Sequence, residues 1–169
     1  MLVHPRQAWD EIASRSDGAS KTLGSNGLLL ATLPAAGWAL RFHDLAPAAR
    51  IESFAMTFAA AMATFASLAA AIHLIAPAYG VTRRWSHAVA VSVHGSTPVL
   101  ACGLLFAWPL LTAVGVIAML HCFYLYYLGL QRVVGCRASD AAEFTAISFL
   151  VSMVIAGTIG AMGSGLGWL

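Results

Sequence analysis

The chain has 169 residues, of which 60% are hydrophobic and only 9% carry a formal charge. A soluble globular protein carries roughly 25% charged residues, so nine Lys and Arg with seven Asp and Glu are too few to cover a water-facing surface. Together with a mean hydropathy of +0.80, this composition excludes an ordinary water-soluble domain and indicates a membrane protein. The net charge of +2 gives no reason to expect a nucleic-acid partner.

Four runs without any charge divide the chain, with lengths of 19, 30, 47 and 26 residues. A membrane helix needs about 20 apolar residues, so the third run is long enough for two crossings, with a turn expected at Trp108-Pro109. The sequence therefore predicts an all-α, polytopic membrane bundle within residues 23–169. The five expected transmembrane helices lie near residues 23–40, 54–79, 87–107, 110–130 and 144–168.

Residues 1–22 precede the first expected span and form a separate, more polar segment. Pro5 suits the first turn of a helix, and a helix here places Trp9 and Ile12 on one side. We expect a short cytoplasmic tail whose helix lies on the inner membrane surface. A frayed polar tail is the alternative.

The positions of Lys and Arg predict the orientation. Seven of them fall on the side of the N-terminus, namely Arg6, Arg15, Lys21, Arg83, Arg84, Arg132 and Arg137, whereas Arg41 and Arg50 fall on the other side. Because short cytoplasmic loops carry an excess of basic residues, we expect a cytoplasmic N-terminus and an external C-terminus. The arginines of the two internal loops, Arg83, Arg84, Arg132 and Arg137, are expected to meet lipid headgroups or a protein partner.

Small residues recur at every fourth position in two of the expected spans. They are Ala55, Ala59, Ala63, Ser67 and Ala71 in the second span, and Ser152, Ala156, Gly160 and Ser164 in the fifth. Such stripes let helix backbones approach closely in lipid. They predict packing within one subunit or, as the sharper alternative, a contact between subunits.

The third span contains Ser96-Thr97-Pro98. Proline removes a backbone donor and clashes with the preceding turn, so a kink is expected here. Ser96 and Thr97 can bond the carbonyls that the kink frees. A broken helix that lines a substrate path, as in transporters, is the alternative.

Three histidines, His73, His94 and His121, fall at similar depths on three different spans. Hydrogen bonding between helices is the commoner role for such residues. If they converged, however, they could bind haem or quinone, or relay protons. His87 lies seven residues before His94, on the same helix face, and could add an inner relay step.

Catalytic signatures such as a nucleophile elbow, a P-loop, a zinc-protease helix or a dinucleotide fingerprint do not occur in the sequence. All seven acids lie in loops or at span ends, which leaves no buried acid pair for general acid-base catalysis. We therefore expect no enzyme, no catalytic residue, no metal site and no cofactor, with haem as the alternative.

Three segments of the chain resemble a known family. The run His94-Gly95-Ser96-Thr97-Pro98, followed by the aromatic span that ends Tyr124-Leu-Tyr-Tyr-Leu-Gly-Leu130, is similar to the Yip membrane proteins, which comprise the Ypt/Rab-interacting proteins and their bacterial relatives. The opening residues Pro5, Trp9 and Ile12 resemble those of bacterial members.

The resemblance implies five spans with a cytoplasmic N-terminus. Eukaryotic members are implicated in vesicle traffic and in contacts with prenylated small GTPases, but the chain has no Asp-Leu-Tyr-Gly-Pro-type motif, so GTPase recruitment is not expected. Following the resemblance to bacterial members, we expect a non-enzymatic scaffold or accessory subunit of a bacterial cytoplasmic (inner) membrane. It is expected to act through helix-helix contacts as a homo-oligomer or within a larger complex. A redox or transport subunit built around the three histidines is the alternative, and a lipid-handling protein is a third possibility.

Overall fold

The structure is a computed structural model that describes residues 4–14 and 18–165. Every element formed by these residues is a helix, as the composition predicts. The α-helices are α1 (Pro5–Ser14), α2 (Ala19–Thr22), α3 (Leu28–Arg41), α4 (Pro47–Ile75), α5 (Trp85–Gly95), α6 (Thr97–Ala101), α7 (Thr112–Gly129) and α8 (Ala141–Gly165). Shorter segments have π geometry, η1 (Leu23–Gly27) and η5 (Leu130–Val134), or 3-10 geometry, η2 (Ala76–Tyr79), η3 (Cys102–Ala107) and η4 (Pro109–Leu111).

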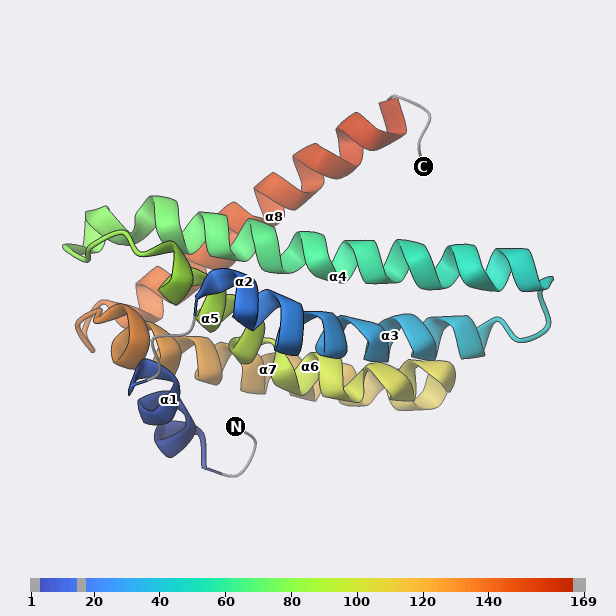
Figure 1. The fold of residues 1–169 in the computed structure, drawn as a ribbon, viewed down its shortest axis with the longest axis horizontal. Coiled ribbons are helices and arrows are strands. Elements are labelled where there is room, and N and C mark those ends of the chain that lie inside the picture. The colour runs from blue at the N-terminus through green and yellow to red at the C-terminus, as the bar shows by residue number, and fades with distance from the viewer. Residues whose placement is uncertain (1–3, 15–17, 166–169) are drawn as a thin grey trace.

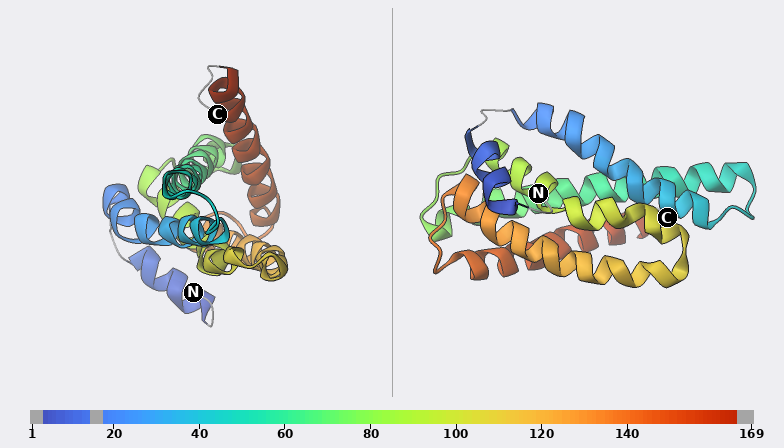
Figure 2. Two further views of the ribbon diagram at one scale, coloured as in Figure 1. Left: turned by 90° about the vertical axis from the view of Figure 1, so that its right-hand side faces the viewer. Right: turned by 90° about the horizontal axis from the view of Figure 1, so that it is seen from below.

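The long helices run back and forth along one axis (Figure 1). α4 contacts α3, α5 and α8, and α7 contacts α5, α6 and α8. The turns that follow α4 and α7 gather at the end where α1 lies, and the turns that follow α3 and η3 lie at the opposite end (Figure 1). α8 diverges from α4, so that the far end of α8 stands away from the other helices (Figure 2).

As far as the structure describes them, the five predicted spans are occupied by helical segments, but the lengths differ. Of the described residues, two continuous stretches are long and apolar enough to cross a bilayer, Pro47–Tyr79 and Pro109–Val134. A third qualifies if Trp85–Gly95 and Thr97–Ala107, which meet at an angle of 43°, are taken as one broken span. α3 has 14 residues, and the apolar described part of α8 is Ala141–Ile155.

Proline sets several of the boundaries. Pro47 occupies the first turn of α4, where its missing N–H has no cost, so this helix begins seven residues before the predicted span at residue 54. The predicted turn at Trp108-Pro109 is present, with Trp108 in an extended conformation between η3 and η4. The third span is not one kinked α-helix to residue 107, because its second half continues as the 3-10 segment η3.

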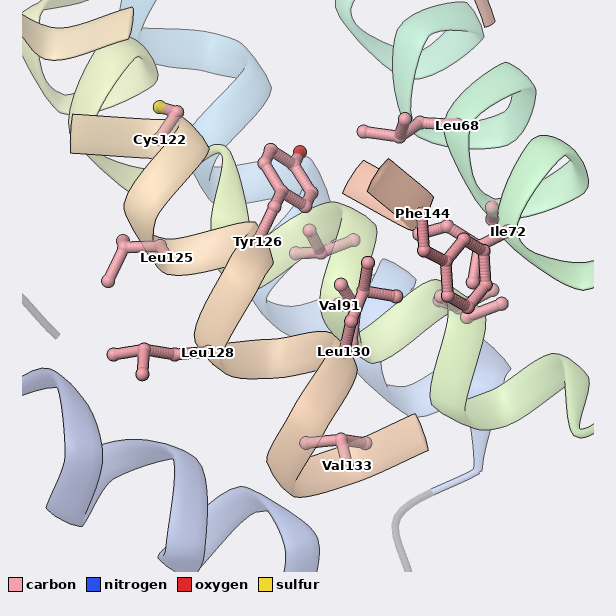
Figure 3. Packing of buried hydrophobic residues seen from close by; sticks show 14 of the residues in the cluster. Leu68, Ile72, Val91, Cys122, Leu125, Tyr126, Leu128, Leu130, Val133 and Phe144 are labelled. Atoms are coloured by element: carbon pink, nitrogen blue, oxygen red, sulfur yellow. The ribbon is translucent and has the colours of Figure 1, made fainter. Parts of the chain in front are cut away.

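The core is concentrated toward the end of the bundle where α1 lies. Trp9, Phe65, Leu125 and Phe144 are among its fully buried side chains, and Figure 3 shows how α4, α5, α7 and α8 supply neighbouring core residues. Several large apolar side chains on the outer surface are exposed by more than 60%, among them Leu29, Ile51, Leu110, Ile117, Leu120, Leu150, Met153 and Val154. Such a surface is unfavourable in water and suits contact with lipid.

Candidate functional site

The predicted kink lies between α5 and α6, and its hydrogen bonds follow from Pro98. Proline has no N–H to offer the carbonyl of His94 four residues earlier. The N–H of Ser96 donates to that carbonyl instead, which leaves the carbonyl of Ser92 without its usual partner. The Ser96 hydroxyl takes this place at 2.8 Å, as predicted. Thr97 begins α6, and among the described residues its hydroxyl takes no part in this network.

Tyr126 of α7 completes the network at the kink. Its hydroxyl lies 2.8 Å from the Ser92 carbonyl, to which it can donate, and is in short hydrogen-bond contact with the hydroxyl of Ser96. The two hydroxyls carry one proton each, so two of these three hydrogen bonds form at a time, and at least one of the two is to the Ser92 carbonyl. Gly95 makes this approach possible, because a Cβ at that position would lie 2.6 Å from the Tyr126 ring. The sequence shows the Gly-Ser-Thr-Pro run and the aromatic run, but their spacing does not reveal that Tyr126 is the residue that meets the kink.

α1 packs against the other helices of the bundle through its apolar side. Trp9 is fully buried and lies so close to α7 that a Cβ on Gly129 would be 2.9 Å from its indole ring. Asp10 forms an ion pair with Arg132 of η5 at 2.7 Å. The tail helix begins at Pro5 as predicted, and it is fixed to the bundle through Trp9; its position relative to a membrane surface stays a prediction.

The small-residue stripe of α4 has two halves with different surroundings. Ser67 and Ala71 are buried, and the Ser67 hydroxyl bonds that of Ser152 on α8 at 2.9 Å. This half packs within the subunit. The other half, which carries Ala55, Ala59 and Ala63, is exposed. In the predicted stripe of α8, the side chains of Ala156, Gly160 and Ser164 lie outside the described residues.

The closest helix crossing involves residues outside both predicted stripes. A Cβ on Gly37 of α3 would overlap the backbone carbonyl of Gly103 in η3, and a Cβ on Gly103 would overlap the backbone of Pro34. Two glycines in a chain with 15 give no periodic signal, which is why the sequence analysis missed this contact.

The three candidate histidines have different aromatic neighbours. His73 lies edge-on to Trp85 at 5.5 Å between ring centroids, His94 edge-on to Trp9 at 6.4 Å, and His121 beside Tyr124 at 6.1 Å. The part of the chain that the structure describes contains no group of three His, Cys, Asp or Glu side chains able to hold a metal ion. The buried Nδ1 of His73 and the buried Nε2 of His121 have no hydrogen-bond partner.

The predicted headgroup or partner residues lie at one end of the bundle. Arg83, Arg84, Arg132 and Arg137 are all exposed, and the turns that carry them gather beside α1 (Figure 1). In the turn before α8, Cys136 is buried. Burial raises the pKa of its thiol, the charge of Asp140 raises it further, and the backbone of Arg137 opposes the shift.

A cavity of about 340 Å³ opens between α4, α6, α7 and α8. Its wall is mostly apolar, with Met119, Phe123 and Phe149 among the lining residues. The hydroxyls of Ser67 and Tyr126 at this cavity are already satisfied by the bonds described above. This cavity therefore combines apolar packing contacts with hydroxyls that already have hydrogen-bond partners.

Comparison with protein families identifies the chain. The model of the Yip1 domain matches residues 1–161. The chain belongs to the Yip1 family. Comparison with curated proteins and with solved structures gives no match. The family match covers the kink, the aromatic span and α1, the three features on which the resemblance rests.

Proposed function

We propose that this Yip1 family member is a five-span protein of a bacterial cytoplasmic membrane, with its N-terminus inside and its C-terminus outside. The positions of the basic residues support this orientation, because α1 and the two turns with Arg83, Arg84, Arg132 and Arg137 lie at the same end of the bundle (Figure 1). In this arrangement five segments span the membrane: α3, α4, the α5–α6–η3 segment, α7 and α8. The four arginines would then meet inner-leaflet headgroups or a protein partner.

We further propose that the protein is a non-enzymatic scaffold or accessory subunit that associates through its helices. The observation that carries this proposal is the exposed half of the α4 stripe. Ala55, Ala59 and Ala63 follow one face of a helix that is long enough to cross the bilayer, and α8 has diverged from α4 along this half (Figure 1). In lipid, a smooth face of small residues favours close packing of another helix.

The test is a pair of Ala→Leu substitutions on this face, Ala59→Leu with Ala63→Leu. The matched control carries two Ala→Leu changes at exposed positions of other helices, Ala113→Leu on α7 and Ala146→Leu on α8. Native mass spectrometry of gently extracted protein should show whole multiples of 17.7 kDa, or a foreign subunit, for the wild type and the control. The Ala59/Ala63 variant should shift to monomer. A wild type that is monomeric, or a variant with unchanged assembly, would refute the α4 surface.

The same assay extends to the second stripe. Replacing Ala156 and Gly160 of α8 with leucine is expected to disrupt assembly if that helix also contributes. Loss of assembly in the α4 variant alone would restrict the interface to α4.

A redox or transport subunit is the second candidate function. The unpartnered nitrogens of His73 and His121 favour it, since a buried polar atom without a partner is unusual. Haem would give a Soret band in the purified protein. A quinone or proton pathway would lose transport on His94→Phe. If neither signal is found, hydrogen-bonding and packing roles account for the histidines.

A further inference from the structure

The apolar cavity between α4, α6, α7 and α8 is far larger than an ordinary packing defect. Its volume is about 340 Å³, whereas about 10–15 Å³ of such space already holds one water and protein interiors contain few larger voids. Cavities of about 300–1,000 Å³ with mostly apolar walls are typical of sites that bind small molecules. The size of this cavity therefore indicates an occupant much larger than water.

Five hydroxyls lie on the wall, and each uses its proton within the protein. The Thr64 hydroxyl donates to a carbonyl of its own helix at 2.9 Å. The Ser67 hydroxyl can donate to the Thr64 carbonyl at 3.0 Å while it accepts from Ser152 at 2.9 Å. The hydroxyls of Ser96 and Tyr126 use their protons in the kink network.

The chemistry of the wall selects an uncharged, apolar occupant. A hydroxyl has one proton, so the five hydroxyls have none left to donate to a phosphate, a carboxylate or a quinone carbonyl. None of the described residues that line the cavity carries a charge. Water is not suited to the site either, because a buried water needs two to four polar partners.

The cavity has a buried floor and an open mouth. Leu68 of α4 and Cys122 of α7 line the floor and are only 2% and 4% exposed, and Leu68 and Tyr126 lie on facing helices (Figure 3). At the mouth, Met119 of α7 and Met153 of α8 are exposed by 54% and 68%. These two side chains belong to the outer apolar surface that suits contact with lipid. The mouth is therefore continuous with the lipid-facing surface, and an occupant can enter sideways from the bilayer.

The floor lies deep within the hydrocarbon. Leu68 and Cys122 belong to the two continuous stretches that are long and apolar enough to cross a bilayer, Pro47–Tyr79 and Pro109–Val134. At 1.5 Å per residue, both lie about 17 Å from the ends of these stretches where α1 lies. The hydrocarbon core is about 30 Å thick, so this depth is close to the middle of the bilayer. Lipid chains reach it, whereas headgroups do not.

We propose that the cavity binds one acyl chain of a membrane lipid, with the headgroup of that lipid outside the cavity. The hydrogen bond between Ser67 and Ser152 holds α8 against α4 beside the cavity, and α8 diverges from α4 beyond this point (Figure 1). A chain in the cavity supplies the van der Waals contacts that the lining atoms otherwise lack. The binding depends neither on the orientation of the protein nor on its assembly.

The test is photochemical labelling of the full chain in phosphatidylcholine nanodiscs. A fraction of the lipid carries a diazirine in the middle of one acyl chain, and the labelled residues are mapped by mass spectrometry. Labels are expected on Leu68 and Cys122 of the floor. Leu120, which is 70% exposed on α7, is the reference for any surrounding lipid. Leu125 is fully buried and does not line the cavity, so it is the reference for a residue that lipid cannot reach.

The variant is Thr64→Trp, because Thr64 lines the cavity but is exposed, so a large side chain there fills the cavity and leaves the fold intact. Its label on Leu68 and Cys122 should fall to the level of Leu125, while the label on Leu120 stays. The matched control is Ala66→Trp, at an exposed position of the same helix that does not line the cavity. This control should be labelled like the wild type.

The same diazirine chain on phosphatidylglycerol should label the floor equally, because only the chain enters. The proposal is overturned if labels on the wild type are confined to exposed residues such as Leu120. It is also overturned if Thr64→Trp leaves the label on Leu68 and Cys122 unchanged, or if only one of the two headgroups gives labels on the floor.

Discussion

The kink network makes a quantitative prediction, because two hydroxyls serve one carbonyl. Tyr126→Phe keeps the ring and its edge-on contact with Phe149 at 4.9 Å but removes the bond to Ser92. The Ser92 carbonyl then still accepts the Ser96 hydroxyl at 2.8 Å. Ser96→Ala leaves the reverse situation, with the Tyr126 bond at 2.8 Å intact. Each single variant therefore removes hydrogen bonds without leaving the carbonyl unpaired.

The double variant differs from both single variants. Ser92 is fully buried, so losing both hydroxyls leaves its carbonyl unsatisfied. A lost hydrogen bond lowers the free energy of unfolding by about 0.5–1.5 kcal/mol, and an unsatisfied buried acceptor costs about 1–3 kcal/mol. We expect each single variant to lose about 1 kcal/mol, and the double variant to lose about 1 kcal/mol more than the sum. Because the two hydroxyls carry one proton each, the wild type has two of these hydrogen bonds at a time, each single variant keeps one, and the double variant keeps none. The excess is therefore the cost of the unsatisfied Ser92 carbonyl.

Reversible unfolding in mixed micelles, followed by tryptophan fluorescence, measures all four members of the cycle. Tyr124→Phe is the matched control, because Tyr124 lies on the exposed side of the same helix and should change stability by less than about 0.5 kcal/mol. A double variant equal to the sum of the single variants, or less destabilised than the sum, would refute the idea that both hydroxyls serve the freed carbonyl.

Three further predictions concern close contacts and one thiol. Gly37→Ala places a Cβ against the backbone carbonyl of Gly103. Because the backbone cannot move aside as a side chain can, we expect this substitution to lower the free energy of unfolding by about 3 kcal/mol or to prevent folding. Gly129→Ala forces the Trp9 ring away from α7, and we expect a loss of about 1–3 kcal/mol with a red-shifted Trp9 emission. Cys136 should react with maleimide only at a higher pH than an ordinary thiol, because burial raises its pKa and only the thiolate reacts.

Each of these has a matched control. Gly24→Ala tests the cost of losing a helical glycine where an added Cβ meets nothing within 4 Å, and it should be neutral or stabilising. Ser139→Cys, in a background without Cys136, presents an exposed thiol three residues away. If this thiol and Cys136 show the same labelling profile between pH 7 and 10, the pKa of Cys136 is not raised.

The sequence was most informative where the cause is local. The kink at Pro98 and the turn at Trp108-Pro109 depend on the covalent geometry of proline, so both could be predicted at the right residues. The all-helical class follows from the charge-free runs, because each of them is long enough for one or two membrane helices. The exact helix limits were less predictable, since α4 begins at Pro47 and includes Arg50 and Glu52, whereas the predicted span begins only after these two charges.

Contacts between distant segments could not be predicted in the same way. The stripe on α4 is periodic throughout, yet only the half with Ser67 and Ala71 is buried, because burial depends on where α8 diverges. The amphipathic pattern around Trp9 likewise fits a lipid surface and a protein surface equally well. A single sequence specifies an apolar face, whereas what covers this face is a property of the three-dimensional packing.

The three segments that resemble the Yip family turn out to be joined by close packing. Trp9 from the tail helix lies against Gly129 of the aromatic span, and Tyr126 of the same span lies against Gly95 at the kink. The recognisable residues therefore hold α1, α5 and α7 together. They form part of the core at the end of the bundle where α1 lies. The exposed half of α4 lies outside these residues, so substitutions there should change association without unfolding the protein.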